Sequence, residues 1–346
     1  MRSNTDTFPA IPQVPPPPPQ APPRKKRLSG FKKFIIFLLA LGVVGVFAAI
    51  GYIAWAEGKI ERIPAEELVS LSNLSTPTGT LNILVVGTDD RSNLPADWDD
   101  HFGQFAGRRA DVIMLAHMLP GERIQLLSLP RDLRVSIPGA GTNRINAAYV
   151  VGGPDMLVRV VQQETAIPVH HYVEIDFGGF GKVVDSLGGV TIDFPYPSRD
   201  AQSGLSVEAG TQKLDGETAV AYARSRHMQI YKDGQWTGSG GGDIARTGRQ
   251  QELLIQMFAQ VTSPSSAFNL PGFLPTFAEQ ITADEGLTLG LMADLARQAL
   301  GLDSRQIESA TLPVRGTSGD DGRSYVVPTD EAPAVIDAFT NGTPYP

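Results

Sequence analysis

Three short apolar segments, each with charged residues at one end, constrain the fold of this chain more than any other feature. They are residues 82–87, 112–116 and 124–129, which are too short for helices and rich in Ile, Val and Leu, so each is predicted to be a buried strand. The charged residues beside them are Asp89, Arg91, Arg109, Asp111, Arg131 and Asp132. If the two outer strands are parallel, these side chains meet at one sheet edge. Charges gathered at a sheet edge are costly unless something binds there, so a binding site is expected at this edge.

Strand and helix signals continue to alternate along the rest of the chain. Residues 172–176 and 190–194 alternate as strands, a helix is predicted to begin at residues 152–154, and Gly188-Gly189 should end another helix. The C-terminal part, with a predicted helix at 289–302 and a strand at 324–328, should close the same domain. This order predicts an α/β fold, a three-layer α/β/α sandwich with a central mixed β-sheet, over residues 81–346.

The N-terminal residues predict a single-pass membrane protein. Residues 1–33 form a Pro-rich, basic tail, and residues 34–56 carry no charge over a length that spans roughly 30 Å of hydrocarbon as a helix. Because the basic cluster precedes this transmembrane helix, the tail should be cytoplasmic, residues 57–80 a linker, and residues 81–346 an extracytoplasmic domain. A cleaved signal peptide ending at Ala54-Trp55-Ala56 is the alternative, but the apolar run is longer than that of a signal peptide.

Charge and cysteine content exclude some functions. The net charge is −8, and residues 1–33 carry seven Lys and Arg against one Asp, so the remaining chain carries −14, which argues against nucleic-acid binding. The chain has no cysteine, so disulfides and thiolate chemistry are excluded. After Arg62 the only lysines are Lys182, Lys213 and Lys232. The preference for arginine suits bidentate phosphate binding, although a GC-rich genome produces the same bias.

A second group of polar residues lies between residues 214 and 251. If residues 223–227 are extended, Arg224 and Arg226 point to the same side. The apolar stripe of the helix that carries Leu253 and Met257 continues towards its N-terminus through Gln250 and Arg246. An arginine on the inward face near the positive end of a helix favours an anion site. The alternative is that Arg246 reaches solvent along its long stem.

Eight short motifs, taken together, resemble the LytR-CpsA-Psr family. In chain order they are Gly87–Arg91, Arg109–Asp111, Leu129–Asp132, Asn143–Tyr149, Leu187–Val190, Leu214–Glu217, Ala223–Arg226 and Arg249–Gln251. Each motif is weak by itself, but their common order is specific. The likeness is loose after residue 261, and in the first 60 residues it extends only to a short tail and one membrane span.

The resemblance implies a membrane-anchored, Mg-dependent phosphotransferase of cell wall biogenesis. Such an enzyme moves a glycopolymer, as its sugar phosphate, from a polyprenyl-pyrophosphate carrier to a hydroxyl of peptidoglycan or another envelope acceptor. The resemblance implies Mg²⁺ or Mn²⁺ held by Asp89 and Asp111. The implied pyrophosphate ligands are Arg131, Arg224, Arg226, Arg246 and Gln250. Asp132 is a candidate for orienting Arg131 or for proton transfer, and Arg91 and Arg109 are expected to contact the two metal-binding acids.

Several alternatives remain open at this stage. In the family the lipid lies in an apolar tunnel, for which residues 112–118, 177–184 and 253–258 are candidates, but a filled core has the same composition. The long segment 92–108 contains further acids, which are either metal ligands or a solvated loop, and the segment 227–245 is also long. A non-catalytic polyprenyl-phosphate-binding regulator is the alternative function. A transcription attenuator is disfavoured by the anchor, and a pyrophosphatase side activity is compatible with the same site.

Overall fold

The computed structural model describes residues 51–73, 81–89, 108–119, 123–240, 242–262, 270–298, 306–319 and 322–346. Residues from Tyr52 to Pro346 form one compact unit. The predicted cytoplasmic tail and most of the predicted transmembrane helix lie outside the described residues. Within the described ranges, no helix combines the length and the apolar character that a membrane crossing needs. The predicted anchor therefore stays a prediction.

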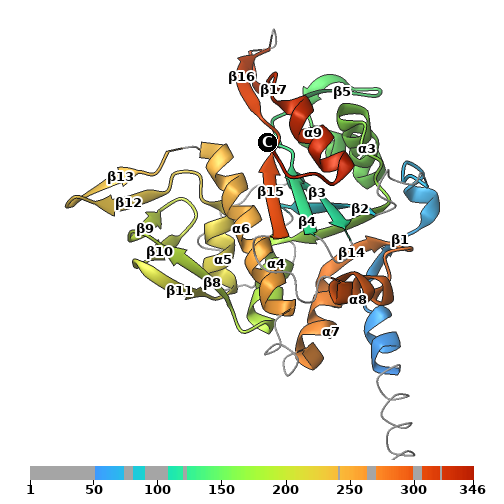
Figure 1. The fold of residues 1–346 in the computed structure, drawn as a ribbon, viewed down its shortest axis with the longest axis horizontal. Coiled ribbons are helices and arrows are strands. Elements are labelled where there is room, and N and C mark those ends of the chain that lie inside the picture. Colours follow the sequence, from blue (N-terminus) through green and yellow to red (C-terminus); the bar gives the residue numbers. More distant parts are fainter. Residues whose placement is uncertain are drawn as a thin grey trace, which may run out of the picture. The chain divides into compact units, whose positions relative to one another are not determined.

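A seven-stranded mixed sheet forms the centre of this unit (Figure 1). Its strand order is β1-β14-β7-β2-β3-β4-β15. The strands are β1 (Glu61–Ile63), β14 (Ile281–Asp284), β7 (His171–Asp176), β2 (Asn82–Thr88), β3 (Ala110–Leu119), β4 (Arg123–Ser128) and β15 (Ile307–Thr311). Because β3 is antiparallel to both β2 and β4, the latter two are parallel to each other. The carboxyl ends of β2 and β4 and the amino end of β3 therefore share one edge, as predicted.

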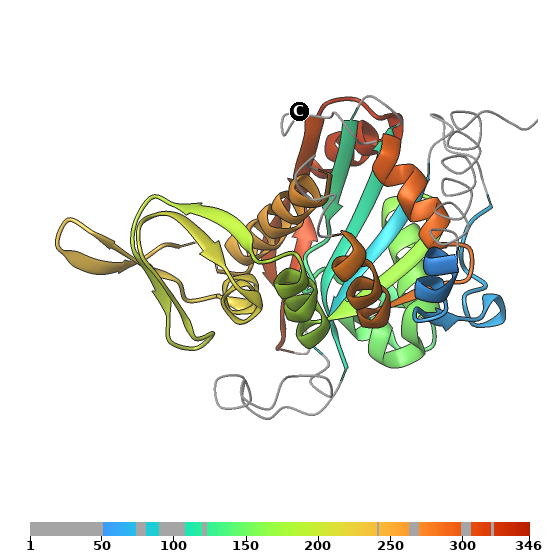
Figure 2. The same cartoon turned by 90° about the horizontal axis from the view of Figure 1, so that it is seen from below.

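Helices cover both faces of the central sheet (Figure 2). The strands alternate, so that Leu84 and Val86 of β2 pack on one face and Ile83 and Val85 on the other. The first face is covered by α3 (Asn146–Thr165) and α9 (Ala332–Asn341), and the second by α6 (Gly242–Thr262), α7 (Leu270–Gln280) and α8 (Leu289–Gln298). The predicted α/β fold with a central mixed sheet is thus confirmed.

Helices α4 and α5 and four smaller sheets also belong to the unit. Helix α4 (Phe177–Ser186) packs against both α5 (Gly216–Arg224) and α7. The smaller sheets are β8 (Val190–Phe194) with β11 (Gly210–Leu214), β5 (Arg134–Ile137) with β6 (Gly141–Arg144), β16 (Val314–Ser318) with β17 (Ser324–Pro328), and the four-stranded β10 (Leu205–Val207), β9 (Ser198–Asp200), β12 (Gln229–Lys232) and β13 (Gln235–Gly238).

Helix α3 begins earlier than the sequence predicts. The glycines and proline at residues 152–154 suggested a helix start, but α3 begins at Asn146 and is kinked where Gly152 and Gly153 leave helical geometry. Gly153 has a φ of 64°, which favours glycine, and the following Pro154 has no N–H to donate. Glycine and proline therefore mark a kink within a longer helix here.

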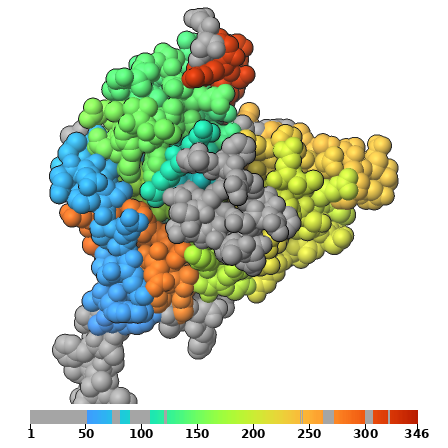
Figure 3. All heavy atoms as spheres, turned by 180° about the vertical axis from the view of Figure 1, so that it is seen from behind, coloured from blue at the N-terminus to red at the C-terminus, as the bar shows by residue number. Residues whose placement is uncertain are grey.

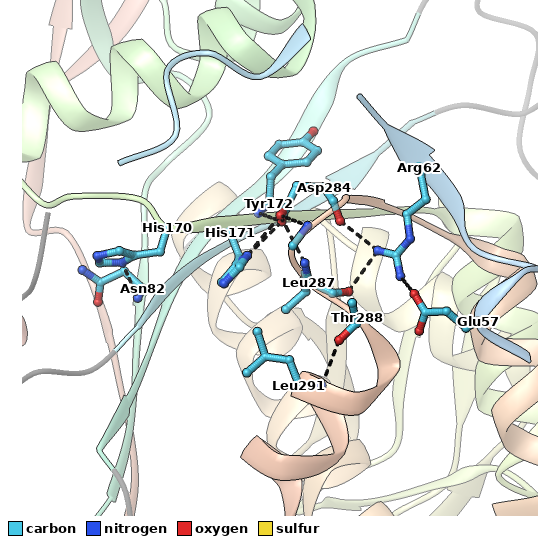
Figure 4. Close-up of polar contacts among 11 residues, drawn as sticks. Glu57, Arg62, Asn82, His170, His171, Tyr172, Asp284, Leu287, Thr288 and Leu291 are labelled. Atoms are coloured by element: carbon cyan, nitrogen blue, oxygen red, sulfur yellow. Dashed lines mark hydrogen bonds and ion pairs between the residues drawn. The ribbon is translucent and has the colours of Figure 1, made fainter. Parts of the chain in front are cut away.

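Part of the segment 57–80, predicted as a linker, belongs to the folded unit. Its strand β1 pairs in parallel with β14 at the edge of the sheet. Arg62 donates hydrogen bonds to the carbonyl oxygens of Asp284 (2.8 Å) and Leu287 (2.9 Å) and pairs with Glu57 (Figure 4). A three-residue strand is too short to give a periodic signal, which is why the sequence pattern missed it.

Candidate active site

Asp111 and Arg131 form an ion pair at the charged edge of the central sheet. The Nη1 of Arg131 lies 2.7 Å from Oδ1 of Asp111, and their side chains are only 15% and 10% exposed. The backbone N–H of Asp89 donates to the carbonyl oxygen of Arg109, so Asp89 leaves β2 directly beside the start of β3. The edge thus brings together Asp89, Asp111 and Arg131, three of the residues predicted for the site.

Asp132 lies between two arginines. Its Oδ2 is 3.9 Å from Nε of Arg131, and its Oδ1 is 3.2 Å from Nη1 of Arg144. Arg144 also donates to the carbonyl oxygen of Ser324 in β17. The Asp132 carboxylate is therefore within ion-pair distance of both guanidinium groups, although neither its Oδ1 nor the Nε of Arg131 has a hydrogen-bond partner among the described residues, so both roles considered for Asp132 stay predictions.

Glu174 is a buried acid beside this edge that the sequence reading did not select. Its side chain is 3% exposed and pairs with Arg108 at 2.6 Å. The hydroxyl groups of Tyr149 and Tyr172 also donate to it. Its place on the same face of β7 as Tyr172 was a readable signal, because alternation puts both on the buried face. Arg108 and Arg109 are both exposed, and Arg108 is the one that contacts this acid. Arg91 lies outside the described residues.

Helix α6 presents buried polar side chains towards α5 and the central sheet. Arg246 is 3% exposed and Gln250 is 6% exposed, so the predicted inward register is confirmed and the alternative of a solvent-reaching Arg246 is wrong. The side chain of Gln250 donates to the carbonyl oxygen of Ala223 at 3.1 Å, and Gln251 donates to Ser128 at the end of β4 at 2.9 Å. Helix α6 is therefore joined both to α5 and to the strand that precedes Arg131.

The arginines of residues 223–227 occupy different environments. Helix α5 continues through Arg224, so this piece is not a strand as considered from the sequence. The guanidinium carbon of Arg224 lies 5.6 Å from the centroid of the Phe177 ring, a cation–π distance, whereas Arg226 is exposed. The side chain of the neighbouring Arg249 donates to the carbonyl oxygen of Ser225. Of the two predicted pyrophosphate ligands, Arg224 thus ends α5 and Arg226 follows that helix, so they do not share a strand face.

Asp200 holds this segment in place, and no sequence pattern pointed to it. The carboxylate is 2% exposed, and its Oδ2 accepts hydrogen bonds from Ser225 Oγ (2.7 Å) and from the backbone N–H groups of Arg226 (3.0 Å) and His227 (2.9 Å). Burial alone raises the pKa of Asp200, but these hydrogen bonds outweigh it and the pKa is lowered. Asp200 therefore remains charged and fixes the backbone of the arginine segment.

An apolar pocket opens where this segment meets the central sheet. It lies between the sheet and helices α4, α5 and α6. The lining residues are Val85, Val86, Gly87, Val112, Ile175, Asp176, Phe177, Phe180, Ala223, Gln250, Leu253 and Leu254. Each of the three segments proposed for a lipid tunnel contributes to this lining. The lining residue Phe177 contacts the guanidinium of Arg224, and the lining residue Gln250 has a polar side chain. The mostly apolar pocket is therefore bordered by polar groups.

The structure describes most of one of the two long segments, 227–245, and only the last residue of the other, 92–108. The acids of residues 92–107 lie outside the described residues. The segment 227–245 contains the hairpin of β12 and β13 before α6. In the described part of the chain, no group of three or more His, Asp or Glu side chains is arranged to bind a metal by itself.

The fold and the site define an α/β domain in which an edge of carboxylates and arginines adjoins an apolar pocket, an arrangement suited to an anion joined to an apolar chain. A sequence profile described as the LytR_cpsA_psr family matches residues 55–340, and the chain belongs to this family.

Known proteins similar to this chain come from several bacteria. It is 32% identical over 277 residues to the probable cell wall biosynthesis protein LcpB of Corynebacterium glutamicum, covering 78% of this chain and 62% of that protein, less than two thirds of its length. It is also 32% identical over 252 residues to the polyisoprenyl-teichoic acid–peptidoglycan teichoic acid transferase TagU of Halalkalibacterium halodurans, covering 72% of this chain and 75% of that protein. The solved structure of a LytR-Csp2A-Psr enzyme from Actinomyces oris matches with a TM-score of 0.63 at 29% identity, covering 82% of this chain and 96% of that one.

Proposed function

We propose that this protein is a membrane-anchored phosphotransferase that moves a glycopolymer phosphate from a polyprenyl-pyrophosphate carrier to a hydroxyl of peptidoglycan or another envelope polymer. The relative TagU is named as a transferase of teichoic acid from a polyisoprenyl carrier to peptidoglycan, which supports the reaction class. The predicted span at residues 34–56 would place the domain at the outer surface of the membrane that carries such a lipid.

The apolar pocket beside Arg224 is the observation that carries this proposal. A mostly apolar interior, lined by residues such as Phe180, Leu253 and Leu254, suits a hydrocarbon chain. At its border, the guanidinium of Arg224 lies over Phe177, and the amide of Gln250 lines the pocket. A polyprenyl chain in the pocket would place its pyrophosphate at this border, within the region of the sheet edge that bears Asp111 and Arg131.

The residues of this edge suit the chemistry of pyrophosphate cleavage. The acceptor hydroxyl oxygen forms a new bond to the phosphorus that carries the sugar, the bond from that phosphorus to polyprenyl phosphate breaks, and the hydroxyl proton passes to a base, either a carboxylate such as Asp132 or water. Negative charge develops on the departing polyprenyl phosphate, where arginine side chains stabilise it. Arg131, Arg224, Arg226, Arg246 and Gln250 are the proposed pyrophosphate ligands. Asp132 would hold Arg131 in orientation, with proton acceptance as its second candidate role.

The residues present fit a divalent cation at the same edge. Asp89 and Asp111 come from adjacent strand ends, and one oxygen of Asp111 is already bound by Arg131. The buried Oγ1 of Thr88 has no hydrogen-bond partner among the described residues, so it could accept a hydrogen bond from a metal-bound water. Asp89 and Asp111 would hold Mg²⁺ or Mn²⁺, which would supply positive charge to the phosphate oxygens. Arg109 would add positive charge nearby, and Arg91 is proposed for the same role.

The test is polymer transfer by the full chain in lipid nanodiscs. The substrates are a polyprenyl-pyrophosphate oligosaccharide and a peptidoglycan fragment, and the product is detected by mass spectrometry with and without Mg²⁺. We expect metal-dependent transfer that Asp111→Ala and Arg224→Ala reduce at least 100-fold, whereas Arg159→Ala, an exposed arginine of α3, leaves it unchanged. Release of sugar phosphate without acceptor would reveal the pyrophosphatase side reaction. Tight carrier binding without turnover, unaffected by Asp111→Ala, would refute the enzyme and favour the regulator.

A further inference from the structure

An aromatic and cationic surface lies on the four-stranded sheet, outside the candidate active site. The strands are ordered β10-β9-β12-β13. In Figures 1 and 2 the β12–β13 hairpin points away from the seven-stranded sheet. In Figure 3 the yellow residues of this region form a lobe that stands out from the surface of the unit. The hairpin spans residues 229–238, within the long segment 227–245, and the candidate active site assigns it no role.

Strand register places four side chains on one face of this sheet. Tyr231 and Trp236 are directly paired across the hairpin, and Gln229 is paired with Arg199 of β9. Gln229 and Tyr231 are two residues apart in β12, so their side chains share a face. Lys232 of β12 belongs to the opposite face, where its Nζ lies 5.4 Å from the ring centroid of Tyr196. The face of Arg199, Gln229, Tyr231 and Trp236 is called the aromatic face below.

Contacts within the aromatic face hold a cation against a flat ring. The guanidinium carbon of Arg199 lies 4.0 Å from the centroid of the Trp236 ring, and its Nε donates to Gln229 Oε1 at 3.0 Å. The rings of Trp236 and Tyr231 are 5.4 Å apart, and Tyr231 is 42% exposed. Within the described residues, no carboxylate pairs with Arg199. Its terminal amino groups are therefore preorganised for an anion from outside the chain, since little side-chain freedom is left to lose on binding.

The charge of the sheet contrasts with the rest of the extracytoplasmic part. Residues after 33 carry a net −14, yet the four strands carry Arg199 and Lys232 as exposed charges and only one acid, Asp200, which is buried. Asp200 also binds the backbone of Arg226, so the sheet is joined to the segment that carries Arg224 and Arg226. Flat apolar rings pack against the C–H faces of sugar rings, and a guanidinium binds phosphate or carboxylate.

The position of the aromatic residues argues against insertion into a membrane. The hairpin turns at Asp233 and Gly234, which have φ values of 54° and 81°, and its tip is therefore acidic and polar. A membrane-inserting hairpin would carry its aromatic residues at the tip, and an aspartate there would be repelled by anionic lipid. Here Tyr231 and Trp236 lie on the side of the hairpin, where a chain running along the sheet can contact them.

We propose that the aromatic face binds the glycan of the carrier-linked substrate, an oligosaccharide that bears phosphate or carboxylate groups. Sugar rings would pack on Tyr231 and Trp236, and Arg199 would bind the anionic groups. The inference rests on the proposed function for the identity of the glycan, because the pyrophosphate to which that glycan is attached would lie near Arg224. The contact would select anionic over neutral polymers at a place distant from the bond that breaks.

The test is binding of a lipid-free oligosaccharide by the full chain in nanodiscs, measured by titration calorimetry. The probes are a phosphate-bearing wall oligosaccharide and a neutral dextran of equal length. We expect the phosphate-bearing probe to bind more tightly than dextran. Trp236→Ala and Arg199→Gln should each raise its Kd at least tenfold, and Trp236→Phe should retain most of the affinity. Tyr196→Ala removes an aromatic ring beside the opposite face and should leave the Kd unchanged. Equal thermal unfolding midpoints would establish that the variants are folded.

Asp111→Ala separates this inference from the proposed function, because it should abolish transfer and leave oligosaccharide binding intact. If transfer is absent even in the wild type but the binding pattern holds, the proposed function fails and the aromatic face remains a glycan site. Unchanged binding in Trp236→Ala and Arg199→Gln would overturn the inference. The inference would also be overturned if these variants bound phosphatidylglycerol vesicles more weakly but bound the oligosaccharide as well as the wild type does. The face would then be a membrane contact.

Discussion

Replacement of Asp200 by asparagine should lower the free energy of unfolding more than the same replacement of an exposed aspartate, because Asp200 holds the arginine segment in place. The Oδ2 of Asp200 accepts three hydrogen bonds, from Ser225 Oγ and the N–H groups of Arg226 and His227, and its Oδ1 accepts one from the N–H of Gln202 at 2.9 Å. An asparagine that keeps its oxygen towards the three donors turns its NH₂ group towards the N–H of Gln202. The N–H of Gln202, in a part-buried bond, then loses its acceptor, and the other three bonds lose their charge.

The magnitude follows from these four bonds. A neutral hydrogen bond contributes about 1 kcal/mol and a charged one roughly twice that, so the lost charge costs about 3 kcal/mol and the orphaned donor about 1 kcal/mol more. The pKa of Asp200 is lowered in the folded state, so this stabilisation is present above about pH 4 and declines as the pH falls further. Transfer activity should fall with it, because the backbone that carries Arg226 loses its anchor.

The assay is urea unfolding of wild type and Asp200→Asn at pH 7 and at pH 3.5, with Asp193→Asn as the matched control. Asp193 is an exposed aspartate of β8 that accepts only a 3.3 Å bond from Thr211, so its replacement should change the free energy of unfolding by less than about 0.5 kcal/mol. The difference between Asp200→Asn and wild type should shrink at the lower pH. A loss below about 1 kcal/mol at pH 7 would refute the reasoning that these bonds hold the segment.

Three further predictions concern the core, the sheet edge and the pocket. Burial lowers the pKa of His117 to about 4, so the neutral side chain contributes its full stabilisation above pH 6.5. The free energy of unfolding should therefore fall by about 3 kcal/mol between pH 6.5 and 4. His117→Gln should remove this pH-dependent loss. Arg131→Ala removes the donor 2.7 Å from the nearly buried Asp111 and should cost about 3 kcal/mol in urea unfolding. The double variant with Asp111→Asn should cost less than the sum of the single variants, and simple additivity would contradict a direct pair. Leu254→Trp partly fills the apolar pocket and should weaken binding of a long polyprenyl phosphate at least tenfold but not of a short-chain analogue, whereas Val150→Trp on the exposed surface of α3 should affect neither.

Local periodicity determined the faces and ends of the regular elements. The apolar run of β2 indicated a buried strand, and three- and four-residue spacing placed Arg246 and Gln250 on the inner face of α6, where both are buried. These predictions were confirmed because the face of a side chain depends only on its position within its own element. The order of the charged residues at the strand ends also supported the resemblance to the family. It could be read from the sequence because those residues are adjacent to the strands that position them.

Contacts between residues distant in sequence were decided by the tertiary structure alone. Glu174 binds Arg108, 66 positions away, and Asp200 accepts hydrogen bonds from the backbone of Arg226 and His227, because strand order and close packing bring these atoms within 3 Å. The aromatic face likewise exists only because β9 pairs with β12, which brings Arg199 over Trp236. The sequence alone determined which faces of the strands and helices are buried, but not which buried or exposed side chains meet, because sheet pairing depends on the whole chain.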